Sequence, residues 1–174
     1  MRLALKLHPD SRCDAVTAIA VEVVRPRAGG LQLSYEVTGA IDQLRLPGVT
    51  GAPARAVELW RHTCFEAFIR PAMGDAYFEF NFAPSTQWAA YRFDGYRSGM
   101  LVAEIGDPRI EVRSLPGRFT LQAVLELDAL PPGPWKLGIS AVIEEASGRL
   151  SYWALTHPPG RPDFHHADCF TCEI

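Results

Sequence analysis

The sequence contains no long apolar run. No stretch approaches the roughly 18 consecutive apolar residues that suggest a membrane-spanning helix. Near the N-terminus, Lys6, His8 and Pro9 interrupt the apolar residues before the core of a secretory signal, about 7–15 residues long, could form. We therefore expect a cytoplasmic protein that has no membrane association.

Blocks of like charge are also lacking. The chain has 17 Lys and Arg against 20 Asp and Glu, a formal net charge of −3, whereas nucleic-acid-binding domains usually carry a basic stripe. Its four cysteines are too few and too unevenly spaced for a disulfide scaffold, so we expect free thiols. We therefore expect no nucleic-acid partner, and these features identify no protein partner.

The sequence has no long segment in which apolar residues recur with the 3.6-residue period of a helix, and its 14 glycines and 14 prolines would disrupt long helices. Apolar and polar residues alternate instead, which is typical of strands with one solvent-exposed face. The alternating segments are residues 2–7, 31–38, 78–83 and 119–127. More uniformly apolar segments, typical of buried strands, cover 17–24 and 137–143. A short helix or 3₁₀ turn is expected within 52–61.

Turn-forming residues separate these segments, as in Pro47-Gly48, Pro116-Gly117 and Pro158-Pro159-Gly160. About nine to eleven short antiparallel strands around one core are typical of two packed sheets. The sequence therefore predicts an all-β, two-sheet antiparallel β-sandwich, with one domain spanning residues 1–174.

Side chains suited to ligand binding gather in residues 58–100 and 149–174, which hold Trp60, Trp88 and Trp153. The C–H face of a pyranose stacks on an aromatic ring, and its hydroxyls bond to Arg, Asn and Glu. The same aromatics are common in sandwich cores. Two hypotheses follow: a carbohydrate-binding domain, or an interaction or scaffold protein whose aromatics are structural.

The order of WRHTCFEAFI, YFEFNFAPSTQWAAYRF, YWALTH and DFHHADCF resembles the DOMON-like superfamily, and more closely bacterial proteins related to the family 9 carbohydrate-binding modules. In that family a tryptophan stands six residues before a glutamate of a strand, as Trp60 stands before Glu66. A later P-x-x-x-W turn is matched by Pro84 and Trp88. The resemblance extends over roughly residues 15–174.

The resemblance implies a β-sandwich in which two aromatic rings clamp a terminal sugar without catalysis. Trp60 supplies one ring, and either Trp153 or Trp88 supplies the other. The implied ligand-binding residues are Trp60, Glu66, Asn81, Gln87, Trp88, Arg92 and Trp153. Relatives often carry acidic calcium ligands before the strand, where this chain has Arg61-His62-Thr63, so calcium is not expected.

Metal and haem chemistry has weaker signals. His165, His166, Cys169 and Cys172 form an H-H-x-x-C-x-x-C pattern of zinc-ligating residue types. We expect the two cysteines to lie on a strand, where positions three apart point to opposite faces. A haem-binding domain, the other DOMON type, would need an axial residue such as Met73 or Met100, and the sequence has no haem attachment motif. We therefore expect no cofactor.

Hydrolytic catalysis would need His157 or His165 beside Glu66 or Glu79. The sequence contains neither G-x-S-x-G nor H-E-x-x-H. We therefore expect a binding protein and not an enzyme.

Overall fold

The computed structural model describes residues 1–49 and 51–174. These residues form twelve antiparallel strands and three short 3₁₀ turns. The strands are β1 (Arg2–Leu7), β2 (Val16–Val24), β3 (Gly30–Gly39), β4 (Cys64–Pro71), β5 (Tyr77–Phe82), β6 (Trp88–Phe93), β7 (Leu101–Val102), β8 (Arg109–Leu115), β9 (Arg118–Glu126), β10 (Trp135–Glu144), β11 (Leu150–Ala154) and β12 (Cys172–Glu173). The 3₁₀ turns are η1 (Ile41–Gln43), η2 (Leu59–Arg61) and η3 (Ala167–Cys169).

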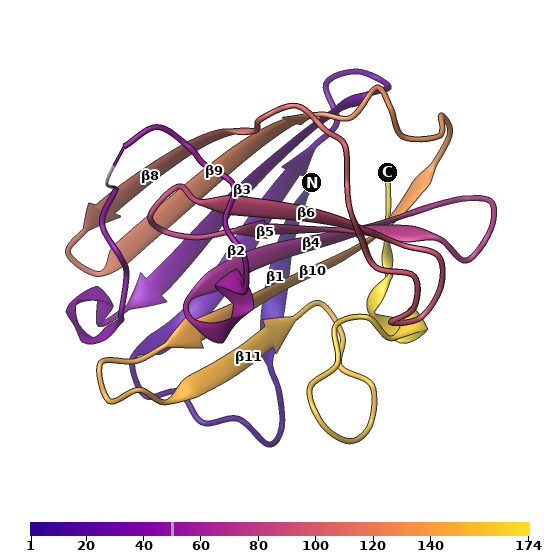
Figure 1. Ribbon diagram of the computed structural model, residues 1–174. Coiled ribbons are helices and arrows are strands. Elements are labelled where there is room, and N and C mark those ends of the chain that lie inside the picture. The colour runs from indigo at the N-terminus through magenta and orange to yellow at the C-terminus, as the bar shows by residue number, and fades with distance from the viewer. Residues whose placement is uncertain (50) are drawn as a thin grey trace.

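The all-β antiparallel prediction is confirmed, but the prediction of two separate sheets is not. The strands follow one path, β7-β6-β5-β4-β10-β11-β1-β2-β3-β9-β8, and β12 also pairs with β10. Strand β1 joins the two halves, because Arg2 to Leu5 pair with β2 whereas Lys6 and Leu7 pair with β11. The result is one sheet that curls over itself (Figure 1).

The main core lies between the two halves of this curled sheet. The Tyr35 ring packs on Phe65 with centroids 5.1 Å apart, and Phe65 stacks on Phe119 at 5.8 Å. The Tyr35 hydroxyl donates a hydrogen bond of 2.8 Å to the backbone carbonyl of Glu66. Residues of β3 and β9 are thus held directly against β4.

Alternation in β4 and β5 gives each strand a second buried face. Phe78, Phe80 and Phe82 point toward the main core, as the sequence predicts. The opposite face of β5 was expected to be solvent-exposed, but Glu79 and Asn81 are buried. His165 lies over this face, where it contacts Tyr77 and Glu79, and Phe164 and Phe170 of the same segment belong to the cluster on this side of the sheet.

In residues 1–49 and 51–174 the helical content is limited to the three 3₁₀ turns, of which η2 lies at the end of the predicted 52–61 segment. In the described part of the chain, no helix is long and apolar enough to cross a membrane.

Candidate functional site

The outer face of β4, β5, β6, β10 and β11 carries a second cluster of buried side chains. Phe68, Tyr77, Tyr91 and Phe93 face outward from their strands, and Phe164 packs on them from the covering segment. Their positions alternate with residues of the main core because successive side chains of a strand point to opposite sheet faces. A cavity of about 510 Å³ lies within this outer layer.

Aromatic rings form much of the cavity wall. They are Trp60, Tyr91, Phe93, Tyr152 and Phe164. Trp60 lies in η2, and its ring meets Tyr91 edge-on with centroids 6.1 Å apart and planes at 70°. The Trp60 residue keeps 37% of its surface exposed, whereas Tyr91 is 6% exposed. Trp60 can therefore contact a ligand at the mouth of the cavity.

Two buried glutamates line the cavity, Glu66 from β4 and Glu79 from β5. They are 3% and 6% exposed. Burial, together with repulsion from Glu79, raises the pKa of the Glu66 carboxyl well above its ordinary value. Burial also raises the pKa of Glu79, although a hydrogen bond from Asn81 and the charge of Arg97 oppose the shift.

The two carboxylates accept few hydrogen bonds. Glu66 Oε2 accepts one of 3.3 Å from the Ser140 hydroxyl, and Glu79 Oε1 accepts one of 2.7 Å from the Asn81 amide. Within residues 1–49 and 51–174, Glu66 Oε1 has no hydrogen-bond partner. The buried Glu66 carboxyl can therefore accept a further hydrogen bond from a ligand in the cavity.

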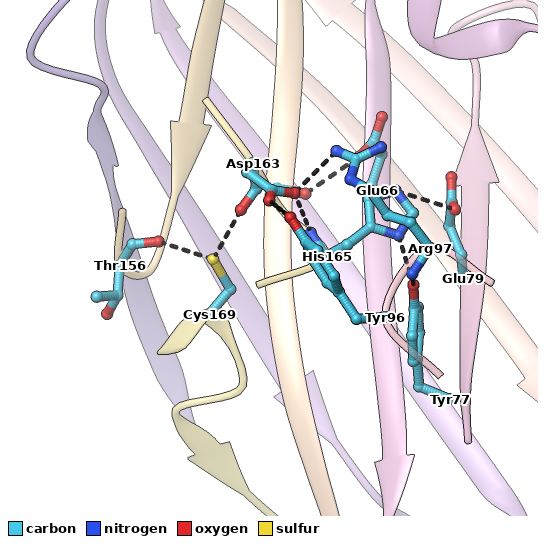
Figure 2. A network of polar contacts seen from close by, with 10 residues as sticks. Glu66, Tyr77, Glu79, Tyr96, Arg97, Thr156, Asp163, His165 and Cys169 are labelled. Carbon is cyan, nitrogen blue, oxygen red and sulfur yellow. Dashed lines mark hydrogen bonds and ion pairs between the residues drawn. The ribbon is translucent and has the colours of Figure 1, made fainter. Parts of the chain in front are cut away.

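A polar network joins residues 96–97 to residues 163–165 (Figure 2), and Arg97 and His165 of this network line the cavity. Asp163 accepts a hydrogen bond of 2.8 Å from Arg97, and it also accepts one from the Tyr96 hydroxyl. His165 Nε2 lies 3.7 Å from Glu79 Oε2, and its Nδ1 lies 2.7 Å from the Tyr77 hydroxyl. Burial, with the nearby charge of Arg97, lowers the pKa of His165 to about 4, so its ring is neutral at pH 7.

Of the predicted site residues, the structure brings Trp60 and Glu66 to the cavity and places Asn81 beside it. Trp60 and Glu66 line the wall. Asn81 is fully buried and acts through its hydrogen bond to Glu79.

The other four predicted residues lie elsewhere. Trp88 and Trp153 belong to the main core on the opposite face of the sheet, at 0% and 6% exposure. Gln87 is an exposed turn residue, and Arg92 is exposed and paired with Asp94 at 3.0 Å. Neither Trp88 nor Trp153 lies where it could clamp a ligand in this cavity against Trp60.

Sequence reasoning missed several cavity residues. Tyr91 and Phe93 could have been found by following alternation along 88–93, because they share a face. Arg97 had no such signal, since it lies in a turn with a positive φ of 51° and meets Asp163, 66 residues away in the chain.

The residues of the H-H-x-x-C-x-x-C pattern do not come together as a metal site. Cys169 lies in η3 and not on a strand as expected, Cys172 lies in β12, and His165 faces Glu79 and Tyr77. Within the described residues, no group of three or more His, Cys, Asp or Glu is placed to hold a metal ion.

No protein-family model matches the chain, and no curated protein matches its sequence significantly. Its fold is similar to that of solved structures. A candidate carbohydrate-binding protein from Bacteroides uniformis superposes with a TM-score of 0.68 at 14% identity, over 98% of this chain and 84% of the other.

A family 9 carbohydrate-binding module from Caldicellulosiruptor kristjanssonii, solved with glucose, matches with a TM-score of 0.50 and 13% identity, over 87% of this chain and 72% of that one. The same kind of module with cellotriose gives the same score and identity, over 70% of its length. The chain therefore has a fold similar to that of these solved structures.

Proposed function

We propose that the protein binds a small saccharide in the cavity on the outer face of β4, β5 and β6, and that it does so without chemical conversion. The observation that carries the proposal is the placement of the partly exposed Trp60 ring and the Tyr91 edge at a cavity that ends at two buried carboxyls. Rings offer stacking to the C–H face of a sugar, and carboxyl oxygens accept hydrogen bonds from its hydroxyls.

The size of the site and the related folds support the proposal. A cavity of about 510 Å³ lies within the usual range for small-ligand sites, which is about 300–1,000 Å³. Two of the structures with the same fold are carbohydrate-binding modules solved with glucose and with cellotriose. In this proposal Glu66 and Glu79 serve as hydrogen-bond partners.

Titration calorimetry with glucose, an amino sugar, cellobiose and cellotriose tests the proposal, with tryptophan fluorescence as a second readout. We expect saturable binding that Trp60→Ala weakens at least about tenfold, the effect of losing roughly 1.4 kcal/mol of stacking. Leu115→Ala is the matched control, because Leu115 is 52% exposed on β8 and lies outside the cavity.

Two results would count against the proposal. The absence of binding to every saccharide by the folded protein would overturn the binding role. Release of nitrophenol from aryl glycosides at a rate that depends on Glu66 would overturn the non-catalytic part.

A further inference from the structure

In the described part of the chain, no fixed cation balances the charge that Glu66 and Glu79 carry when they ionise. Among the described residues, no Lys or Arg makes an ion pair with either carboxylate, and the only ion-pair contact is the 3.7 Å approach of His165 to Glu79. The pKa of His165 is lowered to about 4, so this imidazole supplies no positive charge at neutral pH.

Among the described residues that line the cavity, Arg97 is the one permanent cation, and its charge is already paired. Arg97 lies near enough to lower the pKa of Glu79, but its guanidinium donates to Asp163 at 2.8 Å (Figure 2). An anionic ligand would therefore have to compete with Asp163. With Arg97 balanced by Asp163 and His165 neutral, the carboxyls of Glu66 and Glu79 give the cavity an acidic character.

The rings around these carboxyls favour a cation as well. Ammonium groups are attracted to aromatic faces within about 6 Å, and the attraction is strongest where water is excluded. The cavity places Trp60, Tyr91 and Phe93 in the same wall as Glu66 and Glu79. Glu66 Oε1, which has no hydrogen-bond partner among the described residues, can accept from such a group.

Resting on the proposed function, we infer that the bound saccharide carries a protonated amine, with its ammonium group held by the Glu66 and Glu79 carboxylates and flanked by aromatic rings. An ammonium donates up to three hydrogen bonds, and charge-assisted bonds are roughly twice as strong as neutral ones. A neutral sugar of the same size supplies no positive charge, so it gains no charge-assisted bond from the glutamate pair.

Binding should also release a proton. Burial and mutual repulsion favour the protonated form of the glutamate pair, and an entering ammonium favours the ionised form. Among the described residues, the other titratable or polar groups near the pair come from several elements. They are Tyr35 from β3, Cys64 from β4, Tyr77 and Asn81 from β5, Tyr91 from β6, Ser140 from β10, and Arg97, Asp163 and His165 from the covering segments. Burial raises the pKa of the Cys64 thiol and of the three tyrosines, so they remain protonated near neutrality.

The test compares glucosamine, glucose, N-acetylglucosamine and glucuronic acid by calorimetry at about pH 6.5, where the amine carries its proton. We expect glucosamine to bind at least about tenfold more tightly than glucose, with an enthalpy that depends on the ionisation heat of the buffer. Glu66→Gln keeps the size of the side chain and should remove both the preference and the proton release.

The outcomes separate this inference from the proposed function. Equal affinity for glucose and glucosamine, or tighter binding of N-acetylglucosamine or glucuronic acid, overturns the inference and leaves saccharide binding in place. A glucosamine preference that persists in both Glu66→Gln and Glu79→Gln also overturns it, because the carboxylates would then not be its source. Failure of the folded protein to bind these four sugars, cellobiose or cellotriose overturns both.

Discussion

The Tyr77 hydroxyl lies 2.7 Å from Nδ1 of His165, on the side of the ring away from Glu79. The same hydroxyl accepts a hydrogen bond of 3.2 Å from the backbone N–H of Arg97, so its own proton is free to go to Nδ1. A neutral His165 then carries its proton on Nε2, which faces Glu79. Two covering segments are thus joined to β5 by one hydroxyl.

The low pKa of His165 makes stability depend on pH. The folded pKa is about 4 against an ordinary 6.5, so the unfolded chain binds an extra proton between these values. The stabilisation is complete above pH 6.5 and is lost as pH falls toward 4, a total of roughly 3 kcal/mol. The excess stability of the wild type over His165→Asn, measured by urea unfolding, should shrink across this window. An NMR titration of His165 with a midpoint near 6.5 would contradict the prediction.

The contribution of Glu66 to stability should change with pH in the direction opposite to that of His165. Its folded pKa lies above the unfolded value, so the stability it contributes is present below about pH 4.5 and is lost as pH rises through the folded pKa. We expect Glu66→Gln to unfold like the wild type at low pH and to be more stable by about 1 kcal/mol or more near pH 8. Thermal unfolding across pH measures this.

The control for the loss of one negative charge is Glu111→Gln, at an exposed position of β8. This exchange should not reproduce the gain, because it relieves no burial. A Glu66→Gln protein that is less stable than the wild type at every pH would show that the ionised carboxylate is well accommodated.

Replacement of Trp88 and of Trp60 by alanine should lower the unfolding free energy by different amounts. Trp88 is fully buried beneath the Arg55 guanidinium, which lies 4.0 Å from its ring centroid, so Trp88→Ala should cost about 3–5 kcal/mol of unfolding free energy. Trp60 is 37% exposed, so Trp60→Ala should cost about 1 kcal/mol while weakening saccharide binding. Denaturant unfolding beside calorimetry checks both, and a cost at Trp60 equal to that at Trp88 would contradict the assignment.

Gly39 should tolerate no side chain. Its φ is +146°, and a Cβ there would lie 2.0 Å from the backbone carbonyl oxygen of Ala15. Gly39→Ala should therefore lower the unfolding free energy by more than about 1 kcal/mol. Gly106→Ala is the matched control, because a Cβ at Gly106 meets nothing within 4 Å. Equal stability of the two variants would show that β2 and β3 adjust locally.

Local patterns predicted the strands well, because alternation is a property of neighbouring residues. Residues 31–38 and 119–127 became the paired strands β3 and β9, with Leu33 opposite Ala123. The curl of the sheet could not be predicted in this way. It depends on Leu7 pairing with Trp153, residues that are far apart in the chain and carry no local signal for one another.

The candidate site was predictable only where a motif marked it. The Trp60-to-Glu66 spacing pointed to two residues that line the cavity. Trp88, marked by the P-x-x-x-W turn, and Trp153 were expected to supply the second ring that the family resemblance implies, but alternation turns both toward the main core. Where both faces of a strand are buried, composition does not reveal which face meets a ligand.

The route of β1 between the two halves of the sheet has a kinetic consequence. The site combines η2, β4 and β5 with His165, while the sheet that supports it is completed by pairing residues 6–7 with 153–154. Folding that depends on such distant pairings is slow, on the order of milliseconds to seconds. The chain loses conformational entropy when it closes these long loops, before the stabilising contacts between the strands have formed. Ligand-binding competence should therefore emerge late and all at once during refolding, after strand formation is already visible.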